Sequence, residues 1–154
     1  MTLREAADAD VPALTATINA AFVVERFFKV GDRTSVEETR ARMRRGSFLI
    51  LEDAGRIVAA IFVSAVEGLG YFGTLSVHPA QQGRGFGARM VDAAEQWCRE
   101  RGCSEVEIEV VNLRTELPPF YQRLGYHETG TRPFPDAERS TMPCHFIVMR
   151  KAVR

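Results

Sequence analysis

The sequence is poor in cysteine, with only Cys98, Cys103 and Cys144 among 154 residues. An odd number without a Cys-x-x-Cys pair argues against a disulfide framework or a zinc finger, so we expect three reduced thiols, two near a helix end and one in a strand. The longest strictly apolar run, residues 57–63, is far shorter than the roughly 20 residues of a membrane-spanning helix. The N-terminus has no apolar stretch typical of a secretory signal. We therefore expect a complete, cytoplasmic chain that contacts no membrane.

A net positive charge is also absent, because 20 Lys and Arg residues balance 20 Asp and Glu residues. Without a broad positive field the chain lacks the usual basis of non-specific nucleic-acid binding, and we expect no nucleic-acid partner. No Cys and His residues have zinc-finger spacing, and we expect no metal. The length predicts one domain, residues 1–154.

Hydrophobic spacing predicts the first half of the chain. A strand at residues 2–5 precedes a helix that Asp10 caps, and Ser35 opens a second helix through a capping box. Three strand-like runs follow at 47–52, 56–67 and 71–77, separated by glycine-containing turns (the second of them Gly68-Leu69-Gly70), which indicates an antiparallel meander. Gly73 within the third run indicates a bulge or the close approach of another group.

The second half begins with a glycine-rich turn, residues 78–87, that leads into a helix ending at Gly102. A strand at 104–111, a short helix around 120–124 and a final hairpin complete the order β-α-α-β-β-β-α-β-α-β-β. The hairpin strands are expected at residues 126–131 and 144–151. This order predicts an α/β (α+β) fold with a single mixed, mostly antiparallel central sheet flanked by helices.

The glycine-rich turn is the segment most suited to chemistry. A helix N-terminus leaves main-chain N–H groups unpaired and carries a partial positive charge, so it binds phosphate groups. Gly83, Gly85 and Gly87 would let an anion reach the bare backbone, and Arg84 adds a cation. The turn therefore predicts a phosphate or pyrophosphate site.

Two patterns compete for this turn. Gly83-x-Gly85-x-x-Ala88 satisfies a loose dinucleotide-binding pattern. Five residues, 78–82, separate the preceding strand from the first glycine, and no second βαβ half follows, so this match is weak. A Walker A loop is absent, because no Gly-Lys-Ser/Thr follows the glycines.

The other pattern is more specific. LSVHP at residues 75–79 followed by QGRGFG at 82–87 resembles motif A of the GCN5-related N-acetyltransferases (GNAT), and FYQRLGY at 120–126 resembles motif B of that family. Both motifs occur in the family's order, and the predicted elements match its fold over nearly the whole chain. The resemblance implies an acetyl-CoA-dependent N-acetyltransferase that moves the acetyl group to a primary amine of a small molecule or peptide by direct attack in a ternary complex.

The resemblance also implies how acetyl-CoA binds. The main-chain amide of Val77 would hold the pantetheine arm, and that of Leu75 would polarise the thioester carbonyl, where two strands diverge at a bulge that Gly73 could supply. The residues implied around the diphosphate are Gln82, Gly83, Arg84, Gly85, Phe86, Gly87 and Ala88.

Two further side chains, those of Tyr121 and Asn112, each allow two interpretations. Tyr121 is either the general acid for the leaving thiolate or a packing residue, and a positioned acid is worth ~10²–10⁴-fold in rate. Asn112 either contacts the CoA arm or ends a strand. The general base stays open, because Tyr71 stands where histone-acetylating relatives carry Glu. The candidates are Glu67, His78, Glu107, Glu109 and a water chain.

The acceptor site is implied between residues 25–34 and 132–143, two segments rich in Phe, Pro and charge. Phe27 and Phe28 could line a pocket and Arg33 or Arg132 could bind a carboxylate, or all four could be ordinary core and loop residues. The alternative function is a non-catalytic domain that binds or senses acyl-CoA. The oligomeric state is open between a monomer and a homodimer.

Overall fold

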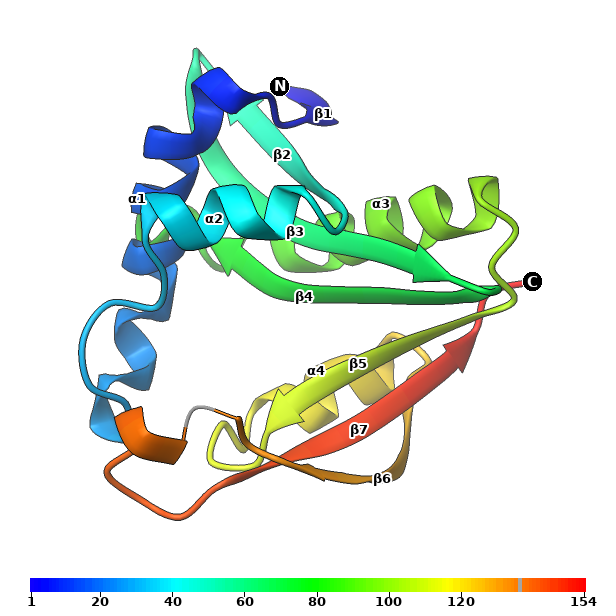
Figure 1. Cartoon of the computed structure of the whole chain (residues 1–154). Helices are drawn as coiled ribbons and strands as arrows, with labels where there is room; N and C mark the ends of the chain where they lie inside the picture. Colours follow the sequence, from blue (N-terminus) through cyan, green and yellow to red (C-terminus); the bar gives the residue numbers. More distant parts are fainter. Residues whose placement is uncertain (136) are drawn as a thin grey trace.

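A computed structural model of the chain describes residues 1–135 and 137–154. In these residues seven strands form one sheet of order β1-β2-β3-β4-β5-β7-β6 (Figure 1). The strands are β1 (Thr2–Glu5), β2 (Ser47–Asp53), β3 (Arg56–Val66), β4 (Leu69–Val77), β5 (Glu105–Val111), β6 (His127–Pro133) and β7 (His145–Ala152). Only β4 and β5 pair in parallel. The predicted mixed, mostly antiparallel sheet is confirmed.

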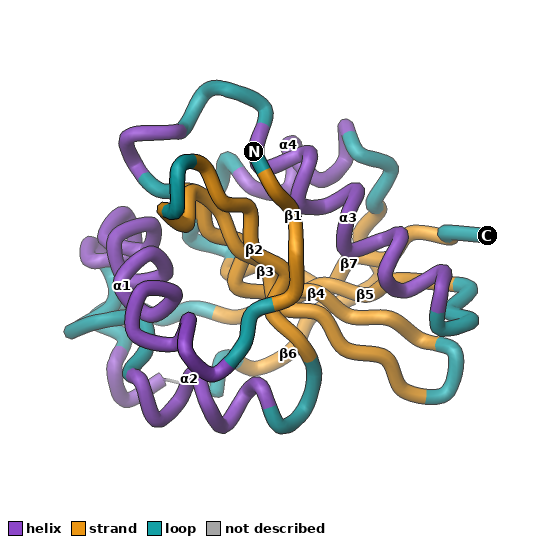
Figure 2. The backbone as a smooth tube through the Cα atoms, turned by 90° about the horizontal axis from the view of Figure 1, so that it is seen from above, coloured by secondary structure: helices purple, strands orange, loops and turns teal. Residues whose placement is uncertain are grey.

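Helices cover both faces of this sheet (Figure 2). They are α1 (Val11–Ala21), α2 (Val36–Met43), α3 (Phe86–Glu100) and α4 (Leu117–Arg123). The predicted order of elements is confirmed. None of the helices within the described residues is long and apolar enough to cross a membrane.

The core has two layers because residues that alternate along a strand face opposite sides of the sheet. Leu14 and Ile18 of α1 pack with Phe48, Ile50 and Phe62 on one face. On the other face, α3 and α4 cover a larger cluster. Its largest fully buried members are Leu51, Ile61, Phe72, Met90, Ile108 and Met149.

Two helix starts differ in how they are capped. The Ser35 hydroxyl accepts a hydrogen bond from the Glu38 N–H at 3.1 Å, as the capping box predicts. Asp10 stands at the N-cap of α1 but makes no side-chain cap. Its carboxylate instead accepts from Arg4 and from the Ala7 N–H, and these hydrogen bonds lower the pKa of Asp10 to about 2.

Besides the side-chain cap expected from Asp10, three further local predictions were wrong. Helix α4 begins at Leu117, so Pro118 and Pro119 lie in its first turn, where a missing N–H costs no helical hydrogen bond. The turn between β3 and β4 is Glu67-Gly68, because Leu69 already pairs with Val66. Cys144 precedes β7 and contacts the Ser140 hydroxyl at 3.5 Å, so it is not a strand residue.

Candidate active site

The sheet opens between β4 and β5. These strands pair only at Leu69/Glu105, Gly70/Val106 and Tyr71/Glu107. Beyond Tyr71 the two strands diverge (Figure 1). The opening that the family resemblance implied is therefore present, and the β5-facing edge of β4 after Tyr71 is free of sheet partners among the described residues.

A β-bulge lies on β4 beside this opening. Ser76 pairs with Ala60 but Gly73 pairs with Phe62, so β4 has one extra residue there. Thr74 adopts φ +51°, a left-handed conformation that is strained for a β-branched residue. The prediction that Gly73 itself supplies the bulge needs correcting. A Cβ on Gly73 would lie 2.5 Å from the Tyr71 hydroxyl oxygen, so this glycine permits a close approach instead.

Two side chains hold the bulge. The buried Ser76 hydroxyl donates to the Thr74 carbonyl oxygen at 3.0 Å. Arg42 of α2 donates from Nη1 to the Thr74 hydroxyl oxygen at 2.8 Å. The strained residue is thus fixed from its own strand and from the helix above it.

The main chain of Val77 faces the opening. The His78 N–H donates to the Val58 carbonyl oxygen at 2.9 Å, which makes these two residues a hydrogen-bonded pair of the β3–β4 ladder. Since such pairs alternate in an antiparallel ladder, the N–H and C=O of Val77 point away from β3. The carbonyl accepts from Gln82 Nε2 at 3.2 Å. The Val77 N–H is left for a ligand.

The turn after β4 presents unused main-chain donors. Gly83 and Gly85 adopt φ +79° and +80°, and a Cβ on either would meet nothing within 4 Å. Gly85 is the N-cap of α3 and no side chain caps this helix. In the described part of the chain, none of the main-chain N–H groups of residues 82–88 donates a hydrogen bond. This open, N–H-lined cradle fits a diphosphate.

A pocket of about 550 Å³, here called the outer pocket, lies against this turn. Eight of the residues predicted to bind the cofactor line it: Leu75, Val77, Gln82, Gly83, Gly85, Phe86, Gly87 and Ala88. Arg84 is not among them, because its guanidinium donates to Gln81 Oε1 at 2.7 Å on the exposed side. Arg114 and Arg123 bring positive charge to the pocket instead, with Glu116 the acidic residue beside them.

A second pocket of about 100 Å³, the inner pocket, fills the opening between β4 and β5. It shares Leu75 and Arg114 with the outer pocket, so the two adjoin. Tyr121 lines it and packs against Phe72, with ring centroids 5.9 Å apart. Burial raises the pKa of Tyr121, which keeps the phenol protonated. Its hydroxyl makes no hydrogen bond to any described residue.

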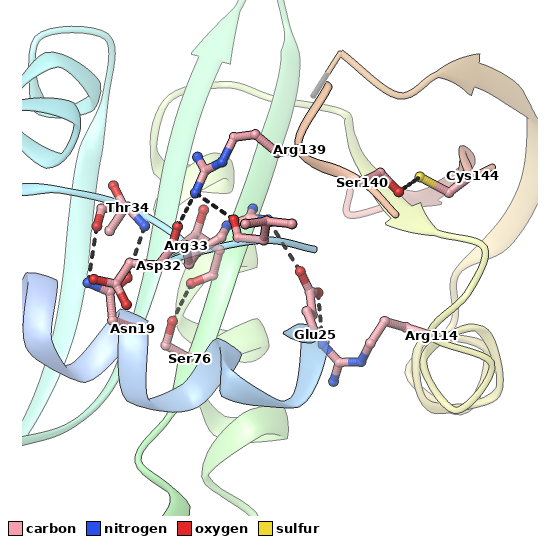
Figure 3. A network of polar contacts seen from close by, with 12 residues as sticks. Asn19, Glu25, Asp32, Arg33, Thr34, Ser76, Arg114, Arg139, Ser140 and Cys144 are labelled. Atoms are coloured by element: carbon pink, nitrogen blue, oxygen red, sulfur yellow. Dashed lines mark hydrogen bonds and ion pairs between the residues drawn. The ribbon is translucent and has the colours of Figure 1, made fainter. Parts of the chain in front are cut away.

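Two carboxylates reach the inner pocket, Glu25 and Glu109. Glu25 is buried and lies between Arg114, at 3.0 Å, and Arg33, at 3.6 Å (Figure 3). Among the described residues, Glu109 pairs with Arg132 at 3.3 Å. The sequence did not single out Glu25. Its one signal is that an acid interrupts the apolar run FVVERFF at residues 22–28.

The other candidate bases line neither the outer nor the inner pocket. Glu67 sits in the turn before β4, at the opposite end of that strand from Val77. His78 Nδ1 accepts from the Ala80 N–H at 3.1 Å. Glu107 is buried between Arg132 and Arg150, each 2.7 Å away. Burial raises the pKa of Glu107, but the hydrogen bonds from these two arginines outweigh it and leave the pKa lowered, which makes a weak base.

Asn112 lies apart from both pockets. Its Oδ1 accepts from the His145 N–H at 2.8 Å, and its own N–H donates to the His145 carbonyl oxygen at 2.9 Å. Asn112 is not among the residues that line the outer or the inner pocket. The side chain therefore ties the end of β5 to the start of β7, as a strand-end residue would.

The two segments predicted to enclose the acceptor meet. Lys29 and Ser140 form a β-bridge, and Val30 and Thr141 donate to the carbonyl oxygens of Arg139 and Phe28 at 2.8 and 2.7 Å. Figure 3 shows Arg139 reaching across to the segment around Asp32. Asp136, within the second segment, lies outside the described residues.

The four residues of these segments that were predicted to line an acceptor pocket lie in different places. Arg33 lines the inner pocket. Phe28 is buried in a small core cluster, and Phe27 is 55% exposed. Arg132 pairs with Glu107 and Glu109 instead. No group of three or more His, Cys, Asp or Glu that could hold a metal ion occurs among the described residues.

Comparisons with known proteins agree with this geometry. The model of the Acetyltransferase (GNAT) family matches residues 15–126. Glucosamine 6-phosphate N-acetyltransferase 1 of Oryza sativa subsp. japonica is 32% identical over 109 residues, which are 65% of this chain and 64% of that protein. The chain thus spans 64% of the length of this curated relative.

Solved structures share the fold over the full chain. The structure of smu.2055 from Streptococcus mutans UA159 has a TM-score of 0.82 and 15% identity, and covers 100% of both chains. That of yncA from Salmonella typhimurium, a putative acetyltransferase with its cofactor acetyl-CoA, has a TM-score of 0.75 and 19% identity, and covers 100% of this chain and 94% of that one. At these identities the likeness shows the fold alone.

Proposed function

The chain belongs to the GNAT family of acetyltransferases, and on that premise we propose that it transfers the acetyl group of acetyl-CoA to a primary amine by direct attack in a ternary complex. We further propose that residues 1–154 act as one catalytic domain. One observation carries the proposal: the outer pocket combines unused main-chain N–H groups with two arginines and continues into the opening between β4 and β5.

The cradle at residues 82–88 would hold the diphosphate of acetyl-CoA. Gly83 and Gly85 keep it open, since any side chain there would occupy the space in front of the N–H groups. The Val77 N–H would bind the pantetheine arm along the free edge of β4. When bound, acetyl-CoA supplies an activated thioester, and its reactive end belongs where the outer and inner pockets meet at Leu75.

Leu75 and Tyr121 are the proposed catalytic groups. A main-chain N–H at Leu75, fixed by the bulge, would donate to the thioester oxygen as negative charge develops there. Removal of such a donor typically costs roughly 3–4 kcal/mol of transition-state stabilisation. Tyr121 would donate its hydroxyl proton to the leaving thiolate, and its raised pKa ensures that the proton is present at neutral pH.

Glu109 is the proposed general base. An alkylamine has a pKa of about 10.4 in water and must lose a proton before it attacks. Glu109 lines the inner pocket and is paired, at 3.3 Å, through one oxygen with Arg132, so it can accept that proton. Glu25 fits this role less well because Arg33 and Arg114 occupy both of its carboxylate oxygens.

The experiment that tests the proposal follows two signals. Acetyl-CoA should raise the unfolding temperature of the purified chain, and released CoA thiol should appear when suitable primary amines are added. Stabilisation by acetyl-CoA with no thiol release across amino sugars, amino acids, polyamines and peptides would favour an acyl-CoA-binding domain instead. Absence of stabilisation would refute both.

A further inference from the structure

A third pocket, of about 150 Å³, lies on the side of the sheet that α1 and α2 cover. It shares Arg33 and Thr74 with the inner pocket, so it extends the same path away from the outer pocket. Its other charged lining residues are Lys29, Arg42 and Glu38. Among the described lining residues there are thus three cations, of which Arg33 also pairs with Glu25, and one carboxylate, and we call this space the basic pocket.

Arg42 is the informative residue of this pocket. The residue is half-buried, and its guanidinium lies 5.1 Å from the centre of the Phe62 ring and donates to the Thr74 hydroxyl at 2.8 Å. No carboxylate in residues 1–135 or 137–154 forms an ion pair with Arg42. A partly desolvated cation without a counter-ion is costly for the free protein, and an anionic ligand would relieve that cost.

The inner pocket, in contrast to the basic pocket, has two carboxylates in its lining. Glu25 and Glu109 line it, next to the edge of β4 where acetyl transfer is proposed. A molecule that carries both charges would therefore bind with its ammonium group toward Glu109 and its anion toward Arg42. The order of charges from the inner pocket to the basic pocket therefore favours a ligand with one amine and one anion, and it also favours one orientation of that ligand.

We propose that the acceptor is a small amine that carries a carboxylate or phosphate group, and that Arg42 binds this anion with Arg33 beside it. The inference rests on the proposed acetyl transfer and names its substrate class. Thr74 precedes Leu75 directly and Arg42 is one hydrogen bond from Thr74, so the anion would lie on the order of 10 Å from the Leu75 N–H. That distance fits an amino acid with an acidic side chain or an amino sugar phosphate, in which the anion is remote from the amine.

A binding experiment tests the pocket without relying on catalysis. Inorganic phosphate is titrated while the unfolding temperature is followed, with saturating CoA present so that the outer pocket is filled. We expect a saturable rise in the wild type and at least about tenfold weaker binding in Arg42→Gln, because charge-assisted hydrogen bonds are lost. The matched control is Arg40→Gln, on the same helix, where Arg40 is exposed and pairs with Asp8 at 3.1 Å.

A second variant acts in the opposite direction and leaves the core untouched. Glu38 is exposed and is the acid that faces the basic pocket, so Glu38→Gln should tighten phosphate binding several-fold. Phosphate binding that is absent from the wild type, or equal in the wild type and the Arg42 and Glu38 variants, would overturn the proposal. If CoA gives no stabilisation, the proposed function fails, while the dependence of phosphate binding on Arg42 still decides whether the basic pocket binds an anion.

A kinetic experiment then separates carboxylate from phosphate. Glucosamine 6-phosphate is compared with glucosamine, and glutamate with glutamine, at saturating acetyl-CoA. In at least one pair the member with the additional anion should have a kcat/KM at least about tenfold higher. Arg42→Gln should reduce that preference to within about twofold and leave the KM for acetyl-CoA unchanged. Equal use of both members in both pairs, or a preference that survives in Arg42→Gln, contradicts the inference.

Discussion

Gly85→Glu probes the cradle most directly. Gly85 adopts φ +80°, and space is open where a side chain would project. A residue with a Cβ costs roughly 1–2 kcal/mol in this left-handed conformation. For a chain of this length, each kcal/mol shifts the unfolding temperature by roughly 2–4 °C, so the free protein should lose about 2–8 °C and stay folded.

The effect on CoA should be far larger than the effect on folding. At a concentration one hundred times its Kd, a ligand stabilises the wild type by about 2.7 kcal/mol, or roughly 5–10 °C. Gly85→Glu should abolish this rise, because a carboxylate would occupy the space meant for the diphosphate. Gly55→Glu is the matched control: it has φ +77°, equally open space and a place in the β2–β3 turn, away from the three pockets.

Differential scanning fluorimetry of both variants, with and without CoA, measures the two effects together. Gly55→Glu should show the same loss in the free protein and keep the full response to CoA. If Gly85→Glu keeps that response as well, the diphosphate does not bind at this turn, and the assignment of the outer pocket is wrong.

Three further predictions concern single side chains. Tyr121→Phe should lower kcat by ~10²-fold or more with little change in the KM for acetyl-CoA, and an unchanged kcat would remove its role as an acid. Glu109→Gln should lose most rate at neutral pH and recover toward the amine pKa, because the amine then loses its proton to solvent; a uniform loss at all pH values would contradict the role of a base. Asp10→Asn should destabilise the chain above pH 4, where wild-type Asp10 is ionised and paired with Arg4, and this difference should shrink between pH 4 and pH 2 as the Asp10 carboxylate, with a pKa of about 2, takes up a proton. Urea unfolding at several pH values measures it, and a difference that persists at pH 2 would contradict the pairing.

Most of the fold could be predicted because local signals and tertiary packing agree. The continuous apolar runs of β2 and β3 and the capping box at Ser35 each indicate an element by themselves. The predictions failed where packing overrides local chemistry. Pro118 and Pro119 look like helix breakers but occupy a first turn, and Gly73 looks like the bulge but stands beside it.

The site divides in the same way. Its proposed CoA side depends on main-chain N–H groups in one short segment, so the pattern of glycines at residues 83–87 predicts it. Its proposed acceptor side is assembled from α1, α2, β4, β5 and the loop after β6, which meet only in three dimensions. Glu25 and Arg42 belong to that side, and no local pattern could have connected them.

The bulge of β4 lies between the proposed CoA side and the proposed acceptor side of the site. This position accounts for the strained conformation of Thr74. Its main chain leads into Leu75, where the outer and inner pockets meet, and its hydroxyl accepts from Arg42 in the basic pocket. A left-handed β-branched residue persists only where its surroundings hold it, and here Ser76 and Arg42 do so. An anion on Arg42 would therefore act on the same residue that positions the Leu75 N–H. The proposed acceptor binding and the geometry of the proposed oxyanion donor would thereby be linked through one side chain.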